Sequence, residues 1–265
     1  MGIVGAGNMG QALLKGLLGA GVPASRLTVV EVDPRKRRQL RGRFRVASAS
    51  IETLAGRCDV ILLAVKPQDM PPVLEALRRS MRAQRPLVIS IAAGLTIASL
   101  QRALGPCPLI RVMPNLPAKV GEGISAMAEG RWARPAHRRL AKAILRCVGE
   151  VVELPERCFD AVTALSGSGP AYFFLIFRAL RDAGVAEGLP RAVAQRLVIH
   201  TALGSARVAA QSAEELETMI AQVASKGGTT EAALKVLARR KLAQALQAGV
   251  HAARRRSQEL TRCLS

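Results

Sequence analysis

The spacing of hydrophobic residues divides the chain into two halves of different character. In the first half, short continuous apolar runs typical of buried parallel strands alternate with stretches of helical period. Strands are predicted at residues 2–4, 27–32, 59–65, 86–91, 109–113, 124–127 and 148–154, and helices after the loop at 5–10, at 34–43, from 67 and at 135–146. From Cys158 onward only helical patterns remain, at about 160–166, 170–187, 190–210, 213–223, 230–238 and 241–263.

A glycine-rich loop joins the first predicted strand to the first predicted helix. Gly5, Gly7 and Gly10 form a G-x-G-x-x-G pattern. In this pattern the first glycine permits a tight turn, the second lets a pyrophosphate approach the backbone, and the third lets helix and strand pack closely. The pattern alone is weak, but here a strand precedes it, and a helix and a second strand follow it. The spacing therefore predicts dinucleotide binding rather than an ordinary glycine turn.

The change of pattern predicts a fold of the α/β class with two domains. Residues 1–154 are expected to form a Rossmann dinucleotide-binding domain, and residues 155–265 an all-α domain, with the boundary near Pro155. A chain of 265 residues is long enough for two domains of ordinary size.

The end of the second predicted strand carries opposing signals about the ribose of the cofactor. Glu31 lies about 20 residues past the loop, where an acid binds the 2′-hydroxyl of NAD. Asp33 and Pro34 are then followed by R-K-R-R at 35–38, which could pair with the 2′-phosphate of NADP. In so basic a chain, such a run is also typical of a solvated helix face. We favour NADPH, with Arg35 as a contact, and keep NADH as the alternative.

A second loop suited to an anion is S-K-G-G-T-T at 225–230. Its glycines free the backbone, its threonines offer hydroxyls and an N-cap, and a helical pattern follows from Glu231. Unpaired N–H groups at such a junction favour an anion. Considered alone, the stretch is more often an ordinary capped loop. Together with the dinucleotide loop, it predicts one site for a cofactor and one for a small carboxylate, as in a small-molecule dehydrogenase or reductase.

The composition is that of a globular protein with an unusual charge. It is 49% hydrophobic, 22% charged and only 3% aromatic, with a net charge of +20. Such a charge favours nucleic acid as a partner, but the cations are spread along the chain, and Trp132 and Tyr172 are the only Trp and Tyr. We expect no specific nucleic-acid partner, and weak nonspecific binding at low salt. No stretch approaches the roughly 20 apolar residues of a membrane span.

Cysteine and histidine positions argue against disulfides and metals. The five cysteines are widely spaced with no C-x-x-C pair, which favours reduced thiols and a cytoplasmic location. His137, His200 and His251 have no ligand spacing, so we expect no metal and no histidine acid. Because a strand is predicted at 2–4, we expect no cleavable signal peptide. This strand is shorter than the first strand expected of a dinucleotide fold.

The stretch S-G-S-G-P-A-Y at 166–172 is predicted to be a flexible turn, with Pro170 near the start of a helix. A hydrolase nucleophile would need G-x-S-x-G between a strand and a helix. The spacing here does not fit, so we interpret the turn as a close-packing joint.

Taken together, these motifs resemble the pyrroline-5-carboxylate reductase family, which makes L-proline in the last step of proline biosynthesis. The resemblance covers essentially the whole chain. It is carried by G-I-V-G-A-G-N-M-G at 2–10, A-V-K-P-Q at 64–68, S-I-A-A-G at 90–94, R-V-M-P-N-L-P-A at 111–118, D-A-V-T-A-L-S-G-S-G-P-A-Y at 160–172 and V-A-S-K-G-G-T-T at 223–230. The first motif is generic, whereas the last two together are highly specific.

The resemblance implies an NAD(P)H-dependent oxidoreductase that acts on the C=N bond of 1-pyrroline-5-carboxylate. It also implies a homodimer, interlocked through the helical domains and often assembled into a decamer. The residues implied for the cofactor are Gly5, Ala6, Gly7, Asn8 and Met9 at the pyrophosphate, and Val65, Lys66, Pro67, Ala93 and Asn115 near the ribose and nicotinamide. The residues implied for the substrate are Ser225, Gly227, Gly228, Thr229 and Thr230, supplied by the partner subunit, with Thr230 bonded to the ring nitrogen as the catalytic residue.

The chain departs from the family pattern at several positions. Lys226 stands where the family usually has proline, Leu116 replaces a usual threonine, His200 replaces a common glutamine, and Ile51 lies where many members have asparagine. These changes bear on cofactor preference and kinetics more than on the type of reaction.

Two other classes of function stay open. A β-hydroxyacid dehydrogenase would share the scaffold, but its G-x-x-G-x-G-x-x-x-K pattern is absent after Gly149. A non-catalytic nucleotide-binding or nucleic-acid-binding protein would fit the charge, but it would not explain the loop at 225–230.

Overall fold

The computed structural model describes residues 1–81 and 85–264, and its backbone divides into two compact units. The first unit comprises Met1–Ser168 together with the chain from Ala253 onward, and the second comprises Gly169–Ala252. Within the described ranges, no helix is both long and apolar enough to cross a membrane.

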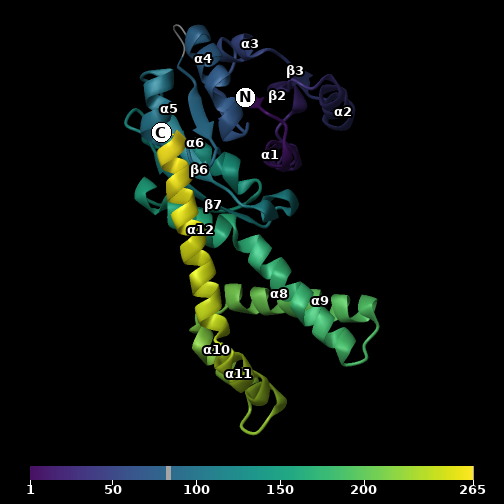
Figure 1. Ribbon diagram of the computed structural model, residues 1–265. Helices are drawn as coiled ribbons and strands as arrows, with labels where there is room; N and C mark the ends of the chain where they lie inside the picture. The colour runs from purple at the N-terminus through teal and green to yellow at the C-terminus, as the bar shows by residue number, and fades with distance from the viewer. Residues whose placement is uncertain (82–84, 265) are drawn as a thin grey trace. The chain divides into compact units, whose positions relative to one another are not determined.

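The first unit is built around an eight-stranded sheet (Figure 1). Its order is β3-β2-β1-β4-β5-β6-β7-β8, and all neighbours are parallel except β6 and β7. The strands are β1 (Gly2–Val4), β2 (Thr28–Val30), β3 (Ala47–Ser48), β4 (Val60–Leu63), β5 (Leu87–Ser90), β6 (Leu109–Met113), β7 (Gly123–Glu129) and β8 (Gly149–Glu153). The order of the first six is typical of dinucleotide-binding folds, so the predicted α/β fold class is confirmed.

Side chains of the central strands alternate between two hydrophobic layers. Ile3 lies opposite Val29 and Leu62 in the sheet, and all belong to one buried cluster, whereas Val4 and Leu63 belong to the other. The continuous apolar runs seen in the sequence follow from this arrangement, because a parallel sheet covered on both faces buries every residue of its central strands.

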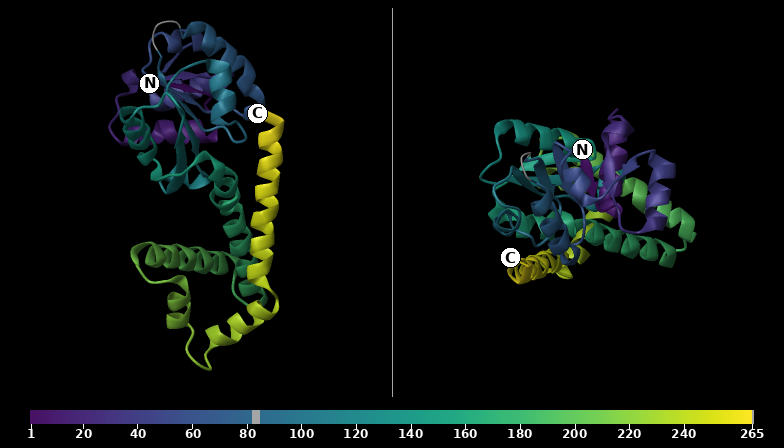
Figure 2. Two further views of the ribbon diagram at one scale, coloured as in Figure 1. Left: turned by 90° about the vertical axis from the view of Figure 1, so that its left-hand side faces the viewer. Right: turned by 90° about the horizontal axis from the view of Figure 1, so that it is seen from above.

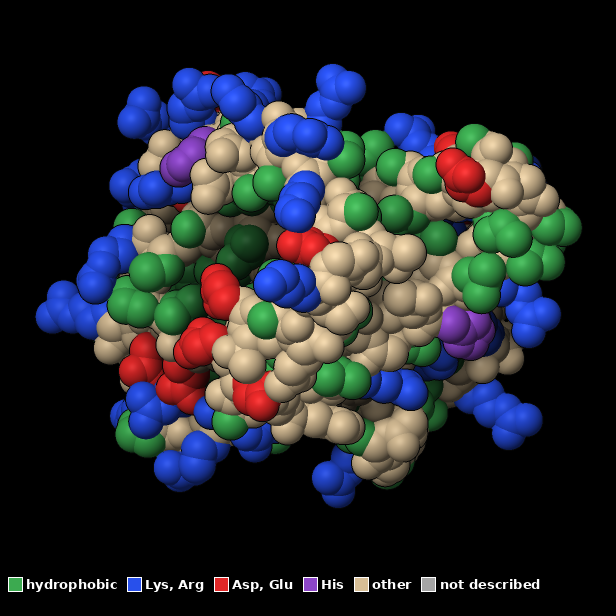
Figure 3. Space-filling view, turned by 90° about the horizontal axis from the view of Figure 1, so that it is seen from below, with side chains coloured by type: hydrophobic (Ala, Val, Ile, Leu, Met, Phe, Trp, Pro, Cys, Tyr) green, Lys and Arg blue, Asp and Glu red, His purple; other side chains and the backbone are tan. Residues whose placement is uncertain are grey.

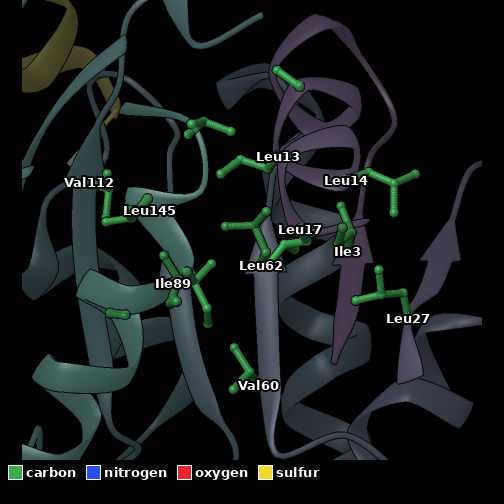
Figure 4. Close-up of a cluster of buried hydrophobic side chains, with 14 of the residues drawn as sticks. Ile3, Leu13, Leu14, Leu17, Leu27, Val60, Leu62, Ile89, Val112 and Leu145 are labelled. Carbon is green, nitrogen blue, oxygen red and sulfur yellow. The ribbon is translucent and has the colours of Figure 1, made fainter. Parts of the chain in front are cut away.

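Helices cover both faces of the sheet (Figure 2). The first layer contains α1 (Asn8–Gly19), α2 (Pro34–Phe44) and α6 (Pro135–Arg146). Figure 4 shows Leu13 and Leu17 of α1 beside Ile3 and Leu62. The second layer contains α3 (Ile51–Ala55), α4 (Met70–Ser80) and α5 (Ile97–Leu104). Each fully buried leucine or isoleucine contributes roughly 1.5–3 kcal/mol to stability.

Local signals decide where these helices begin. Asp33 caps α2 by accepting from the N–H of Arg35, and Pro34 occupies the first helical position. Thr96 caps α5 in the same way, by accepting from Ser99.

The sequence predicts α6 at its observed bounds, but it misses α5, α3 and the short strand β3. Short 3₁₀ helices connect other elements, namely η1 (Ala24–Arg26), η2 (Pro67–Asp69), η3 (Leu116–Val120) and η4 (Glu156–Cys158).

A polar contact fixes the chain that follows β8. Arg111 of β6 is buried, and its guanidinium pairs with Glu156 of η4 at 2.8 Å. The same carboxylate oxygen accepts from the N–H of Ile97, the first residue of α5, at 2.7 Å. Phe159 of α7 (Phe159–Val162) lies under the guanidinium, 4.8 Å from ring centre to carbon. One ion pair therefore joins β6, α5 and the segment after β8.

The end of the last helix, α12 (Leu242–Leu264), packs on the first unit. The buried Ser257 donates to the Asp160 carboxylate at 2.7 Å, and Thr261 donates to the same oxygen at 3.4 Å. The backbone of Gly94, after β5, lies against Leu260 and Leu264. This end of α12 therefore braces the loop that follows β5.

The second unit is a set of helices with almost no core of its own. They are α8 (Gly169–Ala186), α9 (Arg191–Gln211), α10 (Leu216–Val223), α11 (Thr229–Arg239) and the first part of α12. Of the residues described here, only Gly169 and Ala194 are buried. Large apolar side chains are exposed, and Figure 3 shows hydrophobic side chains at the surface among lysines and arginines.

Replacing Glu156 with alanine should destabilise the protein by about 2–3 kcal/mol, because it leaves the buried Arg111 guanidinium without its carboxylate. The value lies below that of a fully buried pair because the Glu156 side chain is 29% exposed. Urea unfolding at a fixed protein concentration measures it.

The matched control is Glu129→Ala, which removes an exposed pair with Arg138 at 3.4 Å. Its expected cost is below about 1 kcal/mol. Equal losses in the two variants would show that burial of Arg111 does not set the cost.

Candidate functional site

The loop between β1 and α1 has the backbone that its glycines were predicted to allow. Gly5 has φ +92°, and a Cβ there would lie 2.8 Å from the carbonyl oxygen of Ala64. Nothing lies within 4 Å of the corresponding point at Gly7, so the backbone is open to a ligand. A Cβ at Gly10 would collide with the carbonyl oxygen of Gly5. The tight turn and the close packing are thus direct consequences of the missing side chains.

The start of α1 presents unpaired backbone donors to this open space. Its N-cap is Gly7, which has no capping side chain, and its first backbone bond runs from Gln11 N–H to the Gly7 carbonyl. Within the described chain, no hydrogen bond is donated by the N–H of Asn8, Met9 or Gly10. These donors and the helix dipole make the loop a site for a phosphate or another anion.

The predicted cofactor residues of the first unit lie at one edge of the sheet. Val65, Lys66 and Pro67 follow β4, Ala93 follows β5, and Asn115 follows β6. These strands and β1 are consecutive in the sheet, so their carboxyl ends meet. The strand order reverses between β1 and β4, and the crevice outside such a reversal is where α/β sheets bind ligands.

Lys66, Ala93 and Asn115 differ in how far their side chains are engaged with the rest of the fold. Lys66 and Ala93 are exposed, so both are available to a ligand. The Asn115 side chain is partly committed to the fold, because its Oδ1 accepts from the N–H of Ile124 in β7 at 2.9 Å. It holds η3 beside β7 and leaves its amide nitrogen for other partners.

The acid after β2 is engaged with the glycine loop. The Glu31 carboxylate accepts from the N–H of Ala6 at 3.2 Å and from the N–H of Asp33 at 3.1 Å. The side chains of Arg35 and its neighbours Lys36, Arg37 and Arg38 are exposed, and in the described residues none of them forms an ion pair. Both sequence signals are therefore present, the acid in the loop and the cations at the surface.

The loop of the second unit, between α10 and α11, starts a helix in the same manner. Gly227 has φ +72°. Its N–H donates to a carboxylate oxygen of Glu231 at 2.6 Å, and the N–H of Gly228 donates to the carbonyl of Ser225 at 3.0 Å. In the described chain, the N–H groups of Thr229, Thr230 and Glu231 donate no hydrogen bond.

The predicted threonine cap of this helix is wrong. Gly228 is the N-cap, no side chain caps the helix, and Thr229 is its first residue. The same glycine lets Ser225 approach, since a Cβ at Gly228 would lie 2.5 Å from the Ser225 hydroxyl. Because no threonine hydroxyl occupies the helix end, its donors stay free for an outside anion.

The predicted flexible turn at 166–172 is also wrong. Thr163–Gly167 is a π-helical turn that leads directly into α8, and the N–H of Ser168 donates to the carbonyl of Thr163 at 2.8 Å. The Ser166 hydroxyl donates to the carbonyl of Val162 at 3.1 Å, so its proton is bonded to the helix backbone. The expected close packing and the helix start at Pro170 are observed.

The sequence did not predict that this π-helical turn lies against the end of β6. A Cβ at Gly167 would lie 2.6 Å from the methyl group of Met113, the last residue of β6. The turn therefore packs where β6 reaches the carboxyl edge of the sheet, and π-helical turns are frequent at functional sites. The signal was the pair of glycines inside an otherwise helical pattern.

Other reactive side chains do not form a centre. The described residues contain no group of three or more His, Cys, Asp or Glu side chains placed to hold a metal ion. All five cysteines are free thiols. Burial raises the pKa of the Cys107 thiol to about 11, which makes it a poor nucleophile.

Comparison with known proteins gives two family models and many relatives. The model described as pyrroline-5-carboxylate reductase dimerisation matches residues 156–260. The model described as NADP oxidoreductase coenzyme F420-dependent matches residues 1–94. A pyrroline-5-carboxylate reductase of Synechocystis sp. is 42% identical over 98% of this chain and 97% of its own length. That of Pseudomonas aeruginosa is 40% identical over 97% and 95%.

Solved structures agree over nearly the whole length. A pyrroline-5-carboxylate reductase of Coxiella burnetii has a TM-score of 0.93 at 33% identity, covering 98% of this chain and 97% of that one. The Plasmodium falciparum pyrroline carboxylate reductase, solved with NADP bound, has a TM-score of 0.88 at 30% identity, with coverage of 98% and 97%. The chain belongs to the pyrroline-5-carboxylate reductase family.

Proposed function

We propose that this protein reduces 1-pyrroline-5-carboxylate to L-proline with NADPH, the last step of proline biosynthesis. The observation that carries the proposal is the pair of glycine-capped helix starts at α1 and α11, each with unpaired backbone donors. One suits the pyrophosphate of a dinucleotide and the other the carboxylate of the substrate.

The cofactor would lie along the carboxyl edge of the sheet. The backbone of Gly5, Ala6, Gly7, Asn8 and Met9 would hold the pyrophosphate, and Val65, Lys66, Pro67, Ala93 and Asn115 would line the ribose and nicotinamide end. Arg35, exposed just after β2, would pair with a 2′-phosphate. Glu31 already accepts two N–H groups, so it is less available to a ribose hydroxyl, which favours NADPH over NADH.

The substrate would bind at the start of α11. The N–H groups of Thr229 and Thr230 would take its carboxylate, and Ser225, Gly227 and Gly228 would shape the loop around it. The Thr230 hydroxyl would hydrogen-bond the ring nitrogen and orient the C=N bond. A threonine is too weak an acid to protonate an amine unaided, so Thr230 would position the ring and relay a proton through water.

The reaction needs orientation more than acid catalysis. When bound, NADPH would supply a hydride from C4 of its nicotinamide. The carbon of the protonated imine accepts the hydride, the C=N π electrons remain on nitrogen, and the product is the secondary amine of proline. Because the iminium is already electrophilic, the loops mainly hold the reacting atoms in place, an effect that can lower a barrier by roughly 7–11 kcal/mol.

A homodimer would complete the helical half. The second unit exposes large apolar side chains, including Phe173, Phe174, Leu197, Leu203 and Val208, and a helix with such a face needs a partner surface. A second copy, with residues 155–265 as its dimerisation and substrate-binding domain, would supply that surface. The resemblance favours further assembly into a decamer, and the free thiols favour a cytoplasmic location.

The proposed function predicts that NADPH is oxidised only when 1-pyrroline-5-carboxylate is present, with L-proline as the product. The absorbance of reduced nicotinamide follows the rate, and amino-acid analysis identifies proline. We expect kcat/KM with NADPH to exceed that with NADH by about tenfold or more, equivalent to about 1.4 kcal/mol. A folded protein without turnover on either cofactor would contradict the function. A preference for NADH would contradict only the role of Arg35.

Thr230→Ala should lower kcat/KM for the imine by about one to two powers of ten, because the ring nitrogen loses its partner. Thr230→Ser keeps the hydroxyl and should recover most of the rate. Thr229→Ala keeps the backbone N–H and serves as the matched control, with a small effect. If Thr230→Ala behaves like the wild type, Thr230 has no part in the mechanism.

Leu203→Glu should dissociate the proposed dimer into monomers, because it places a charge in the proposed interface. Turnover should then be lost, because the substrate loop is expected to come from the partner subunit. Sedimentation equilibrium measures the mass. The control is Leu140→Glu on α6, since Leu140 and Leu203 are 43% and 45% exposed. A wild-type protein with the mass of a monomer would rule out the dimer.

A further inference from the structure

Glu231 occupies an unusual place in the loop that begins α11. It is the third residue of the helix, and its side chain turns back toward the loop. One carboxylate oxygen accepts from the N–H of Gly227 at 2.6 Å, and the other pairs with Lys235 at 3.0 Å. The chain thus places a carboxylate of its own beside the amides expected to receive the carboxylate of a substrate.

The contact determines which donors remain free. The N–H of Gly227 is taken by Glu231, and that of Gly228 by the carbonyl of Ser225. The unpaired donors then begin at Thr229. Gly227 has φ +72°, and a glycine is free to adopt other backbone conformations, so a hydrogen bond at its N–H restrains the turn.

The glycine loop of the first unit also has a glutamate that accepts from the N–H just before a glycine N-cap. There the N-cap is Gly7, and the N–H of the preceding residue, Ala6, is taken by Glu31 at 3.2 Å. In α11 the N-cap is Gly228, and the N–H of the preceding residue, Gly227, is taken by Glu231. In each loop, a glutamate satisfies the amide just before the cap and leaves the amides just after it free.

Lys235 offsets the charge that this arrangement brings to an anion site. Its ammonium group and the N–H of Gly227 lower the pKa of Glu231. The pair has no net charge, which limits repulsion of an incoming carboxylate. Lysine four residues after glutamate is also the favourable order on a helix.

We propose that Glu231 is a positioning residue for the substrate carboxylate. Its hydrogen bond to Gly227 orders the turn, so that the N–H groups of Thr229 and Thr230 point at one spot before the substrate arrives. This inference rests on the proposed function and assigns to its substrate site a residue that never contacts the reacting atoms.

The test compares Glu231→Ala and Glu231→Gln with the wild type, each as the intact oligomer with NADPH. In Glu231→Ala the KM for 1-pyrroline-5-carboxylate should rise about tenfold, while kcat and the KM for NADPH change less than about twofold. In Glu231→Gln the amide oxygen still accepts from Gly227, so this variant should recover most of the wild-type KM. Amide hydrogen exchange of the ligand-free loop should quicken in Glu231→Ala and not in Glu231→Gln.

The matched control is Glu214→Ala, which removes another glutamate hydrogen bond of the second unit, to Gln222 at 2.7 Å. It should leave the KM for the imine unchanged. Turnover by the wild type decides the proposed function separately, before any variant is compared.

Three results would overturn the inference. An unchanged KM and unchanged exchange in Glu231→Ala would show that the loop is ordered without this contact. A lower KM would show that the carboxylate competes with the substrate. Equal rises in both KM values, shared by Glu214→Ala, would show a general loss of stability.

Discussion

The first backbone N–H groups of an α-helix have no acceptor inside the helix, and the proposed chemistry of this protein depends on that constraint. Some helices of this chain meet it in part with a capping side chain, as Asp33 does for α2 and Thr96 does for α5. The helices that follow the two predicted anion loops do not. Glycine is the N-cap of α1 and of α11, no side chain accepts from the first N–H groups of either helix, and these donors stay unpaired in the described chain. Both helices therefore begin with glycine and with unpaired donors, as their proposed role in binding anions requires.

An open helix end is useful only if the loop before it is held in place. In the first unit, the parallel pairs of β1 with β2 and β4 fix the position of Gly5, and the Ala6 N–H is held by Glu31. Farther along the same edge, the ion pair of Arg111 and Glu156 anchors the segment that leads into the π-helical turn beside Met113. Buried packing and a few polar contacts over long sequence distances therefore set the geometry of the carboxyl edge of the sheet, where the cofactor is proposed to bind. The second unit contains no sheet, so the order of its loop has to come from local contacts and from the proposed partner subunit.

Much of this could be predicted from the sequence, because the deciding information is local. The apolar runs mark the strands, and Pro135 with the helical period after it marks α6. Glycine is needed at positions 5 and 10 because a side chain there would collide with neighbouring backbone. What could not be predicted depends on contacts between distant residues. The pairs of Glu31 with Ala6 and of Glu156 with Arg111 join residues 25 and 45 positions apart. The two wrong predictions have a physical cause of their own. A threonine next to a glycine looks like a cap, but the glycine takes that position, and a glycine-rich stretch looks like a turn, but a π-helical segment accommodates it.

The charge of +20 and the anion loops act at different ranges. Both proposed ligands are anions, so a positive surface raises their encounter rate, and salt weakens that effect over about 8–10 Å. Surface charge cannot orient a C=N bond, whereas fixed N–H groups can. Lys226 shows the difference, because the family resemblance leads one to expect proline at this position. A lysine there adds a charge beside the loop, but it gives up the fixed φ with which proline would stiffen the turn. The neighbouring Gly227 is the residue whose N–H Glu231 holds. The hydrogen bond from Gly227 to Glu231 of α11 therefore restrains the turn at the point where the absence of proline leaves the backbone freer. The charge of Lys226 alone could not restrain it.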